Sequence, residues 1–190
     1  MPKTKRKKVT WKQHKRRWSN CDNCLLCHRR TKVVLARGSL PCDVLFIGEA
    51  PGDSEDVLGK PFIGPAGRLL DEMIEHSLPD DSSVSTAFTN LVGCIPKDET
   101  NRKSGEPPEE SIKACQERLA ELVSIAKPRM IVCVGRLSAK WMALNFSEEE
   151  LPVCYEISHP AYIIRLDVSQ KGLAIQRTIV ALNDAFEEEL

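Results

Sequence analysis

One loop of the sequence, residues 48–56, concentrates groups that could act on a bound molecule: two glycines, a proline and four acidic residues. The glycines follow neither spacing of the nucleotide-binding loops and no lysine follows directly, so a phosphate cradle is excluded. Because an acidic turn repels phosphate, its carboxylates, among them Glu49 and Asp53, suit a water molecule or a positive group instead. The competing interpretation is a solvated turn that caps a helix, which is the commoner fate of a polar loop.

A second loop, residues 59–67, places three glycines and two prolines around one aromatic residue, Phe62. Glycine and proline together hold the backbone in tight turns. A lone phenylalanine usually belongs to a core. Flanking turns usually expose a ring, however, and an exposed ring is a platform on which a planar ligand can stack. Both interpretations of Phe62 are open on the residues alone.

Two further polar residues stand at the ends of apolar segments, Asn90 and His159. The Asn90 amide offers a hydrogen-bond donor and an acceptor together, which suits recognition of a ligand edge. Taken alone, Asn90 is equally a polar strand end satisfied by backbone, and His159 is equally a capping or core histidine. His14, His28 and His76 have no comparable setting, and we expect them at the surface.

Eight cysteines are present, and their spacing favours a metal site. Cys21 and Cys24 form a Cys-x-x-Cys pair, whose spacing lets both sulfurs face one metal. Cys24 and Cys27 repeat that spacing, so they form an equally good pair. Spacing alone does not distinguish zinc from an iron–sulfur cluster. The other interpretation, apolar burial, is expected for three cysteines beside or within apolar strands: Cys42, Cys133 and Cys154.

Short apolar runs alternate with longer amphipathic ones after residue 41, which is typical of repeated strand–helix units. We expect strands at residues 43–47, 87–92, 130–134 and 153–158. We expect helices at residues 66–77, 107–125, 137–144 and 171–188, and a short helix is possible from residue 10.

Strands this continuously apolar predict a parallel sheet that is covered on both faces. The fold class is therefore α/β: a three-layer α/β/α sandwich with a central four-stranded parallel sheet. Ligands of such sheets bind outside the carboxyl ends of the strands. Glu49, Asn90, Gly135 and His159 each stand at one of these ends, so we expect them to converge on one edge.

The 190 residues suit one compact domain with a tail. The net charge of zero conceals an asymmetry: residues 1–40 carry thirteen Lys/Arg against one acid and the remainder is correspondingly acidic. This indicates a polyanion-binding arm on an acidic body. No secretory segment or membrane-length apolar run occurs, so we expect a soluble, cytoplasmic protein whose cysteines are not a disulfide framework.

Several of these segments together resemble one family. The run from Gly48 to Leu70 resembles the first motif of the family 4 uracil-DNA glycosylases, where a Gly-Glu-x-Pro-Gly turn precedes an acidic pair, a Gly-x-Pro-Phe-x-Gly element and Ala-Gly-x-Leu-Leu. The run from Thr89 to Cys94 resembles that family's second strand, and His159-Pro160-Ala161 resembles its closing histidine motif. The similarity extends from Cys21 to about Arg165, and its ordered motifs are highly specific.

The resemblance implies an enzyme of DNA repair that flips uracil out of DNA and hydrolyses its N-glycosidic bond, leaving an abasic site. Phe62 would stack on the base and Asn90 would read it, in a site that also includes Gly48 and Ala50.

The same resemblance implies the catalytic roles. His159 would stabilise the negative charge that develops on the leaving base. Glu49, helped by Asp53, would hold or polarise the attacking water. Apart from the resemblance, the position of Arg165 a few residues past His159 leads us to expect that it contacts a DNA phosphate. The implied partner is uracil-containing DNA, without a membrane, and we expect a monomer.

A [4Fe–4S] cluster is the cofactor that the resemblance implies, held by Cys21, Cys24, Cys94 and Cys115. No redox step is needed in base excision, so the cluster would be structural. The sequence spacing from Cys24 to Arg30 and to Val33-Val34 fits the family pattern better when Cys21 and Cys24 are the ligands. Cys27 would then bind no metal.

Two segments depart from the family pattern. Residues 95–106 form a longer and more charged loop than usual, and its lack of histidine argues against the covalent trapping of uracil that some relatives perform. Residues 1–20 form a basic arm ahead of the glycosylase domain, residues 21–190. Such an arm is more often a solvated tail, but its charges and two tryptophans suit salt-sensitive binding to the DNA backbone.

Two other functions are compatible with the residues. One is a non-catalytic module that binds uracil-containing or damaged DNA and keeps the metal cluster. The other is a zinc-stapled hydrolase of a small nucleotide. Release of free uracil distinguishes the enzyme from the binding module, and the identity of the metal tests the third possibility.

Overall fold

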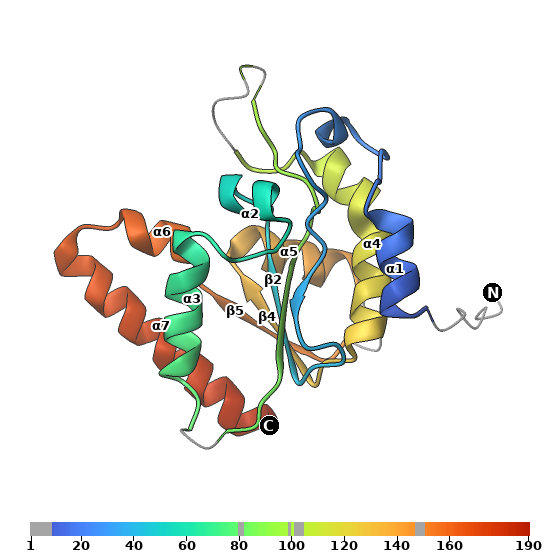
Figure 1. Cartoon of the computed structure of the whole chain (residues 1–190). Helices are drawn as coiled ribbons and strands as arrows, with labels where there is room; N and C mark the ends of the chain where they lie inside the picture. The colour runs from blue at the N-terminus through green and yellow to red at the C-terminus, as the bar shows by residue number, and fades with distance from the viewer. Residues whose placement is uncertain (1–8, 80–81, 99, 101–104, 147–150) are drawn as a thin grey trace.

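The structure, a computed structural model, describes residues 9–79, 82–98, 100, 105–146 and 151–190. A five-stranded sheet lies at its centre in the order β1-β3-β2-β4-β5 (Figure 1). The four longer strands are parallel to one another, and the short strand β1 pairs antiparallel with β3. Their bounds are β1 (Arg37–Gly38), β2 (Val44–Gly48), β3 (Thr86–Asn90), β4 (Met130–Val134) and β5 (Val153–Ile157).

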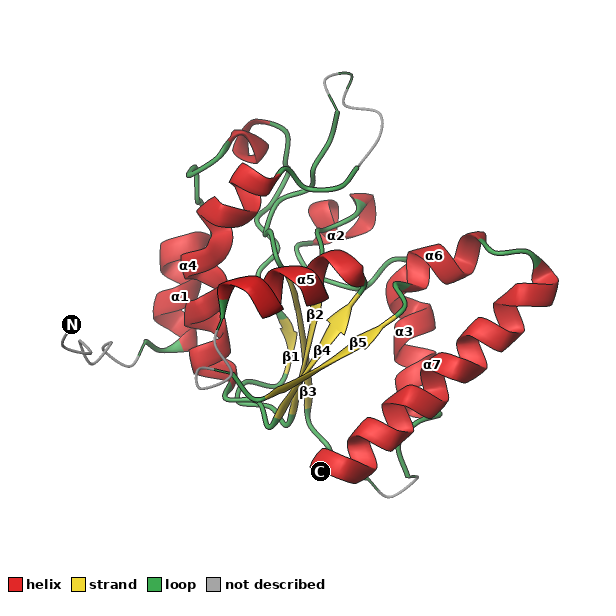
Figure 2. Cartoon of the chain, turned by 180° about the vertical axis from the view of Figure 1, so that it is seen from behind, coloured by secondary structure: helices red, strands yellow, loops and turns green. Residues whose placement is uncertain are grey.

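Helices cover both faces of this sheet (Figure 2). One face carries α4 (Glu109–Ala126) and α5 (Arg136–Asn145), with α1 (Trp11–Trp18) packed on the outside of α4. The other face carries α3 (Pro65–Glu75), α6 (Pro160–Arg165) and α7 (Val168–Glu189). Two short elements complete the chain, the 3₁₀ turn η1 (Leu25–His28) and α2 (Asp53–Leu58).

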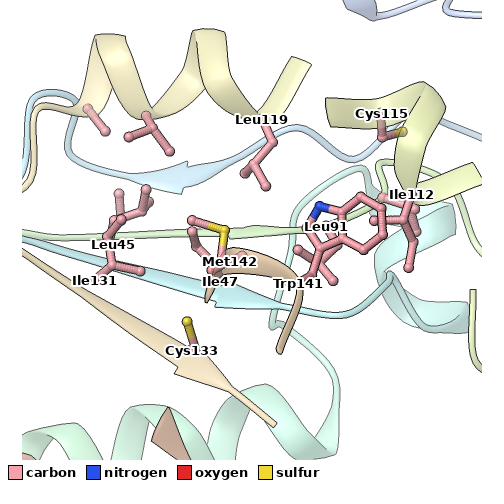
Figure 3. Close-up of a cluster of buried hydrophobic side chains, with 14 of the residues drawn as sticks. Leu45, Ile47, Leu91, Ile112, Cys115, Leu119, Ile131, Cys133, Trp141 and Met142 are labelled. Carbon is pink, nitrogen blue, oxygen red and sulfur yellow. The ribbon is translucent and has the colours of Figure 1, made fainter. Parts of the chain in front are cut away.

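The core consists of two apolar layers, one on each face of the sheet. Every residue of β2 and β4 is buried, as expected of central strands covered on both sides. On one face, side chains of α4 and α5 such as Leu119 and Met142 pack with strand residues such as Leu45 and Ile131 (Figure 3). This packing holds the carboxyl ends of the strands in a fixed arrangement.

The predicted three-layer sandwich is confirmed, with the four parallel strands within two residues of their expected bounds. The expected helices begin and end within three residues of prediction, and the possible helix after residue 10 is present. The strand β1 was not predicted, because two residues at a sheet edge leave no apolar pattern. Two short helices were also missed.

Both missed helices follow local rules that act over few residues. The helix α2 replaces part of the expected acidic loop: its first turn holds Asp53, Glu55 and Asp56, and acids there favourably oppose the helix dipole. It ends at Gly59 in the left-handed region, with φ of 77°. The helix α6 begins directly after the His159 cap.

The basic helix α1 is docked on the protein. Its capping box at Thr10 starts the helix, and Trp18 is buried with its indole N–H 3.2 Å from Glu121 Oε1. His14 was expected at the surface, and that prediction is wrong: the side chain is fully buried, with Nδ1 2.8 Å from the same carboxylate. Arg17 Nη1 also donates to Glu121 Oε2 at 2.9 Å, so one acid of α4 anchors three residues of α1.

The cysteines expected to be buried divide in two. Cys42 and Cys133 are buried, as predicted. Cys154 is exposed, so that prediction is wrong. The reason is that β5 forms the edge of the sheet, where most of its residues are open to solvent despite their apolar character. Among the described residues, no helix has the length and apolar character needed to cross a membrane.

Candidate active site

The loops that follow the parallel strands meet at the carboxyl edge of the sheet and enclose a cavity of about 400 Å³. Residues from four separate segments border this cavity. Those that the sequence singled out are Glu49, Ala50, Asp53, Phe62, Asn90 and His159. The convergence follows from topology, because the ends of parallel strands necessarily face the same side.

Glu49 is the first residue after β2 and is half-buried. Its carboxylate accepts a hydrogen bond from the backbone N–H of Leu137 in the first turn of α5, where the helix dipole also favours a negative charge. Burial raises the pKa of Glu49, the charge of Glu106 raises it further, and the Leu137 bond opposes both. The result is a carboxylate of increased basicity, as suits a group that takes a proton from water.

Gly135 separates Glu49 from His159. A β-carbon at this position would lie 2.8 Å from Glu49 Oε1 and 3.2 Å from His159 Cβ. The backbone has φ of 100°, a conformation that glycine adopts without strain. Glycine is therefore required here for two reasons, its conformation and the space that it leaves between the acid and the histidine.

His159 caps the N-terminus of α6 and is half-buried. Its Nδ1 accepts a hydrogen bond from the Ala161 N–H at 3.1 Å. An accepting Nδ1 carries no proton, so the neutral ring bears its proton on Nε2. Burial lowers the pKa of His159, and the charge of Arg165 lowers it further. The ring is thus a neutral hydrogen-bond donor at neutral pH.

Phe62 and Asn90 come together over Gly48. A β-carbon on Gly48 would lie 2.4 Å from Phe62 Cζ and 2.5 Å from Asn90 Oδ1. Both side chains are buried, and the Phe62 ring centroid is 5.9 Å from that of Phe88 in the core. The core interpretation of Phe62 is confirmed, and the exposure expected from the flanking turns is not found. The ring also borders the cavity, so its role as a stacking platform stays a prediction.

Two acids of α2 have structural contacts that their position in a polar loop did not reveal. Glu55 is buried and accepts hydrogen bonds from the Ile63 and Gly64 N–H groups at 3.1 and 2.9 Å, so it fixes the backbone beside Phe62. Asp56 is 1% exposed and accepts the Thr31 N–H at 2.8 Å. Only long-range contacts distinguish these acids from solvated ones.

Two other expected site residues lie toward solvent. Asp53 borders the cavity, but its side chain is 76% exposed and its carboxylate is 3.5 Å from Lys97 Nζ. Arg165 is exposed at the end of α6, near enough to affect His159.

The four cysteines that the resemblance names as ligands lie in one region. Burial raises the pKa of the Cys94 thiol to about 12, the Arg30 guanidinium lowers it, and Cys115, Cys24 and Cys21 raise it. Cys94 and Cys115 are buried, and Cys21 and Cys24 are half-buried. These segments are distant in sequence, so the fold has gathered four thiols around a positive group.

A single metal ion and an iron–sulfur cluster place different requirements on these cysteines. In the described part of the chain, no three His, Cys, Asp or Glu side chains are grouped so as to hold one metal ion. A [4Fe–4S] cluster has a different requirement, because each thiolate binds a different iron and the sulfurs need not converge on one point. In addition, Arg30 Nη1 is buried without a hydrogen-bond partner among the described residues, which suits a donor to the sulfur of such a group.

The chain is similar to known proteins in sequence and in fold. The chain is 39% identical over 132 residues to the type-4 uracil-DNA glycosylase of Sulfurisphaera tokodaii, covering 67% of this chain and 57% of the relative. It is 40% identical over 121 residues to the protein of the same name from Pyrobaculum aerophilum, covering 64% and 58%. The chain therefore spans less than two thirds of the length of these relatives.

A solved structure is similar in fold: the crystal structure of wild-type Pedobacter heparinus SMUG2, with a TM-score of 0.56 and 15% identity over 77% of this chain and 76% of that one. A family model, described as the uracil DNA glycosylase superfamily, matches residues 36–182, which include the whole sheet and the cavity. This chain belongs to the uracil DNA glycosylase superfamily.

Proposed function

We propose that this protein is an iron–sulfur uracil-DNA glycosylase, which excises uracil from DNA by hydrolysing the N-glycosidic bond and leaves an abasic site. One observation carries the proposal. An aromatic ring and a side-chain amide meet over Gly48 in a cavity that is also bordered by a carboxylate of raised pKa and a neutral histidine. The first pair suits recognition of a planar base, and the second suits its hydrolysis.

Recognition begins with a uracil that is turned out of the DNA stack, at a cost of a few kcal/mol. The Phe62 ring offers a face on which the base stacks. The Asn90 amide donates one hydrogen bond and accepts another, which matches the imide N–H and neighbouring carbonyl oxygen of uracil. Gly48 leaves the space that the Phe62 and Asn90 side chains occupy, and Ala50 borders the cavity that would receive the base.

Hydrolysis requires stabilisation of two opposite charges. As the N-glycosidic bond breaks, its electron pair leaves with uracil and the sugar becomes cationic. The His159 Nε2–H donates to the uracil oxygen on which negative charge develops. The negative Glu49 carboxylate stabilises the sugar cation. It also orients the water that attacks the sugar carbon and accepts a proton from that water. Asp53 adds negative charge at the rim.

The proposed [4Fe–4S] cluster would be held by Cys21, Cys24, Cys94 and Cys115. When bound, it supplies a covalent link between the segment after α1, the loop after β3 and the helix α4. No electron transfer is required in base excision. Arg30 would compensate part of the negative charge of this centre.

The proposed DNA contacts are electrostatic. Arg165 is exposed near His159, where a phosphate next to the flipped nucleotide would lie. The exposed face of α1 adds Lys12, Lys15 and Arg16. The rest of the proposed basic arm, residues 1–8, lies outside the described residues, as do residues 99 and 101–104 of the charged loop. We expect a monomer inside the cell, with DNA affinity that falls with salt.

Release of free uracil from a uracil-containing oligonucleotide tests the proposal. We expect the wild-type protein to release uracil and Glu49→Gln, Asn90→Ala and His159→Ala to lose at least about tenfold to a hundredfold of the rate. Matched controls are Asn183→Ala and His76→Ala, because Asn183 binds the Ser77 carbonyl and His76 is exposed at the end of α3. Both controls should release uracil at the wild-type rate.

The second candidate is a module that binds uracil-containing DNA without turnover. The observation that favours this module is the position of Asp53: its side chain is mostly exposed at the rim and forms an ion pair with Lys97. Binding of the same oligonucleotide without release of uracil by the metal-loaded protein would establish the module and contradict the enzyme. A colourless, zinc-containing protein would contradict the cluster.

A further inference from the structure

We infer that Arg118 is a positioning residue for uracil recognition, because it holds the end of β3 that carries Asn90. This inference rests on the proposed function, since it assigns Asn90 to the base. Arg118 lies on α4, one turn after Cys115. It has no place in the motifs by which the sequence resembles the family.

The Arg118 guanidinium binds three consecutive residues at the end of β3. Its Nη2 donates to the backbone carbonyls of both Asn90 and Leu91, the latter at 3.0 Å, and its Nη1 donates to Thr89 Oγ1 at 3.3 Å. The Thr89 hydroxyl in turn donates to the Leu35 carbonyl at 2.7 Å. These bonds connect the strand end to α4 and to the segment before β1.

The opposite side of the same strand end is bound to β2. The Leu91 N–H donates to the Gly48 carbonyl at 2.9 Å, and the Val92 N–H donates to the Glu49 carbonyl at 3.2 Å. The peptide that carries Asn90 is therefore fixed from two directions. A shift of that peptide would turn the amide away from Phe62 or into it, because the two side chains already meet over Gly48.

Burial of Arg118 is costly, which indicates a specific requirement. The side chain is 1% exposed, and no ion pair among the described residues includes it. A buried guanidinium without a carboxylate pays a desolvation cost that an apolar side chain of similar size would avoid. An apolar side chain, however, could not donate hydrogen bonds to the carbonyls of Asn90 and Leu91. The arginine thus serves the strand end rather than the core.

Inhibition of the enzyme by free uracil tests this inference, because it measures the base pocket without the chemical step. We expect Arg118→Met to raise the inhibition constant for free uracil by up to about tenfold, because a displaced Asn90 amide loses a neutral hydrogen bond to the base. The KM for uracil-containing DNA should rise with it, while kcat changes less than threefold. Arg118→Lys keeps the charge and some donors, and it should recover part of the loss.

A control separates positioning from general destabilisation. Leu122 is fully buried on the same helix, one turn further on, and Leu122→Ala should lower the melting temperature while the inhibition constant stays unchanged. All assays are made below the melting midpoints. If Arg118→Met does not fold, Arg118→Lys alone decides through the inhibition constant and the NMR shift of the Asn90 side-chain amide.

The outcomes are distinguishable. A wild-type protein that releases no uracil contradicts the proposed function. A wild-type protein that releases uracil, with unchanged inhibition constants and Asn90 amide shifts in the folded Arg118 variants, overturns the positioning role and leaves the proposed function intact.

Discussion

The Glu49 carboxylate and the His159 ring approach the same point, above Gly135. A carbon atom placed there would contact Glu49 Oε1 and the His159 ring together, at 2.8 Å and 3.3 Å. Glu49 follows β2 and His159 follows β5. Gly135, which follows β4 and has no side chain, leaves the space between them. In the proposed reaction the attacking water and the sugar occupy this space. A side chain that fills it should therefore slow the reaction.

Gly135→Ala should reduce the rate of uracil release about a hundredfold, because a displacement of about 1 Å at reacting groups has an effect of this size. The positive φ adds strain of about 1–3 kcal/mol to the folded state. Single-turnover kinetics and thermal unfolding measure the two effects. Gly172→Ala is the control: nothing lies within 4 Å of its added carbon and it stands inside α7, so activity should be unchanged and stability equal or higher. A fully active Gly135→Ala protein would refute the proposed geometry.

The pH dependence of kcat/KM should show an acidic limb above the range of an ordinary carboxylate. Burial and the charge of Glu106 raise the pKa of Glu49, and the reaction needs the ionised form, so activity falls as pH decreases through this raised pKa. Burial and the charge of Arg165 lower the pKa of His159, so its protonation is expected below the range of an ordinary histidine.

Glu106→Gln should move this acidic limb to lower pH, since it removes one of the two causes that raise the Glu49 pKa. Glu110→Gln, at an exposed position in the first turn of α4, should leave the limb where it is. Rate profiles of the three proteins across the acidic range decide the matter. An unchanged limb in Glu106→Gln would mean that another group is titrating.

Glu55→Ala should destabilise the protein by about 1–3 kcal/mol, because the buried Gly64 N–H and the half-buried Ile63 N–H lose their acceptor. The KM for uracil-containing DNA should also rise, since these residues follow Phe62 directly. Thermal unfolding and steady-state kinetics measure the two changes. Glu75→Ala is the control, because Glu75 is exposed at the end of α3. Equal stability of both variants would exclude a structural role for Glu55.

Cys115→Ser should lose iron and sulfide, lose visible absorbance and melt at lower temperature, because serine is a poor ligand and the link between α4 and the rest of the centre is broken. Cys27→Ser should keep the metal, since Cys27 is absent from the groups that act on Cys94. Cys133→Ser tests the effect of altering a buried thiol in the core. Iron loss in Cys27→Ser with retention in Cys21→Ser would reassign the pair of close ligands.

Much of the fold could be predicted from the sequence because it depends on local patterns. The continuous apolar runs of β2 and β4 predict a sheet that is covered on both faces, and the structure has it. The errors occurred where such patterns are weak or misleading. β1 is too short to show one, Cys154 belongs to an apolar run that folds as an exposed edge, and His14 lies in a basic segment yet is buried by contact with Glu121.

The sequence was sufficient to predict which segments meet at the cavity: Asn90 ends a strand, Glu49 and His159 come after strands, and a parallel sheet brings such positions to one edge. Only the tertiary structure decided how these groups are tuned. Glu55 supports the loop after Phe62, Glu106 raises the pKa of Glu49, and Arg118 holds the strand end of Asn90. Acids and arginines of this kind look like solvated residues in a sequence, because burial and charge depend on what the rest of the chain packs around them.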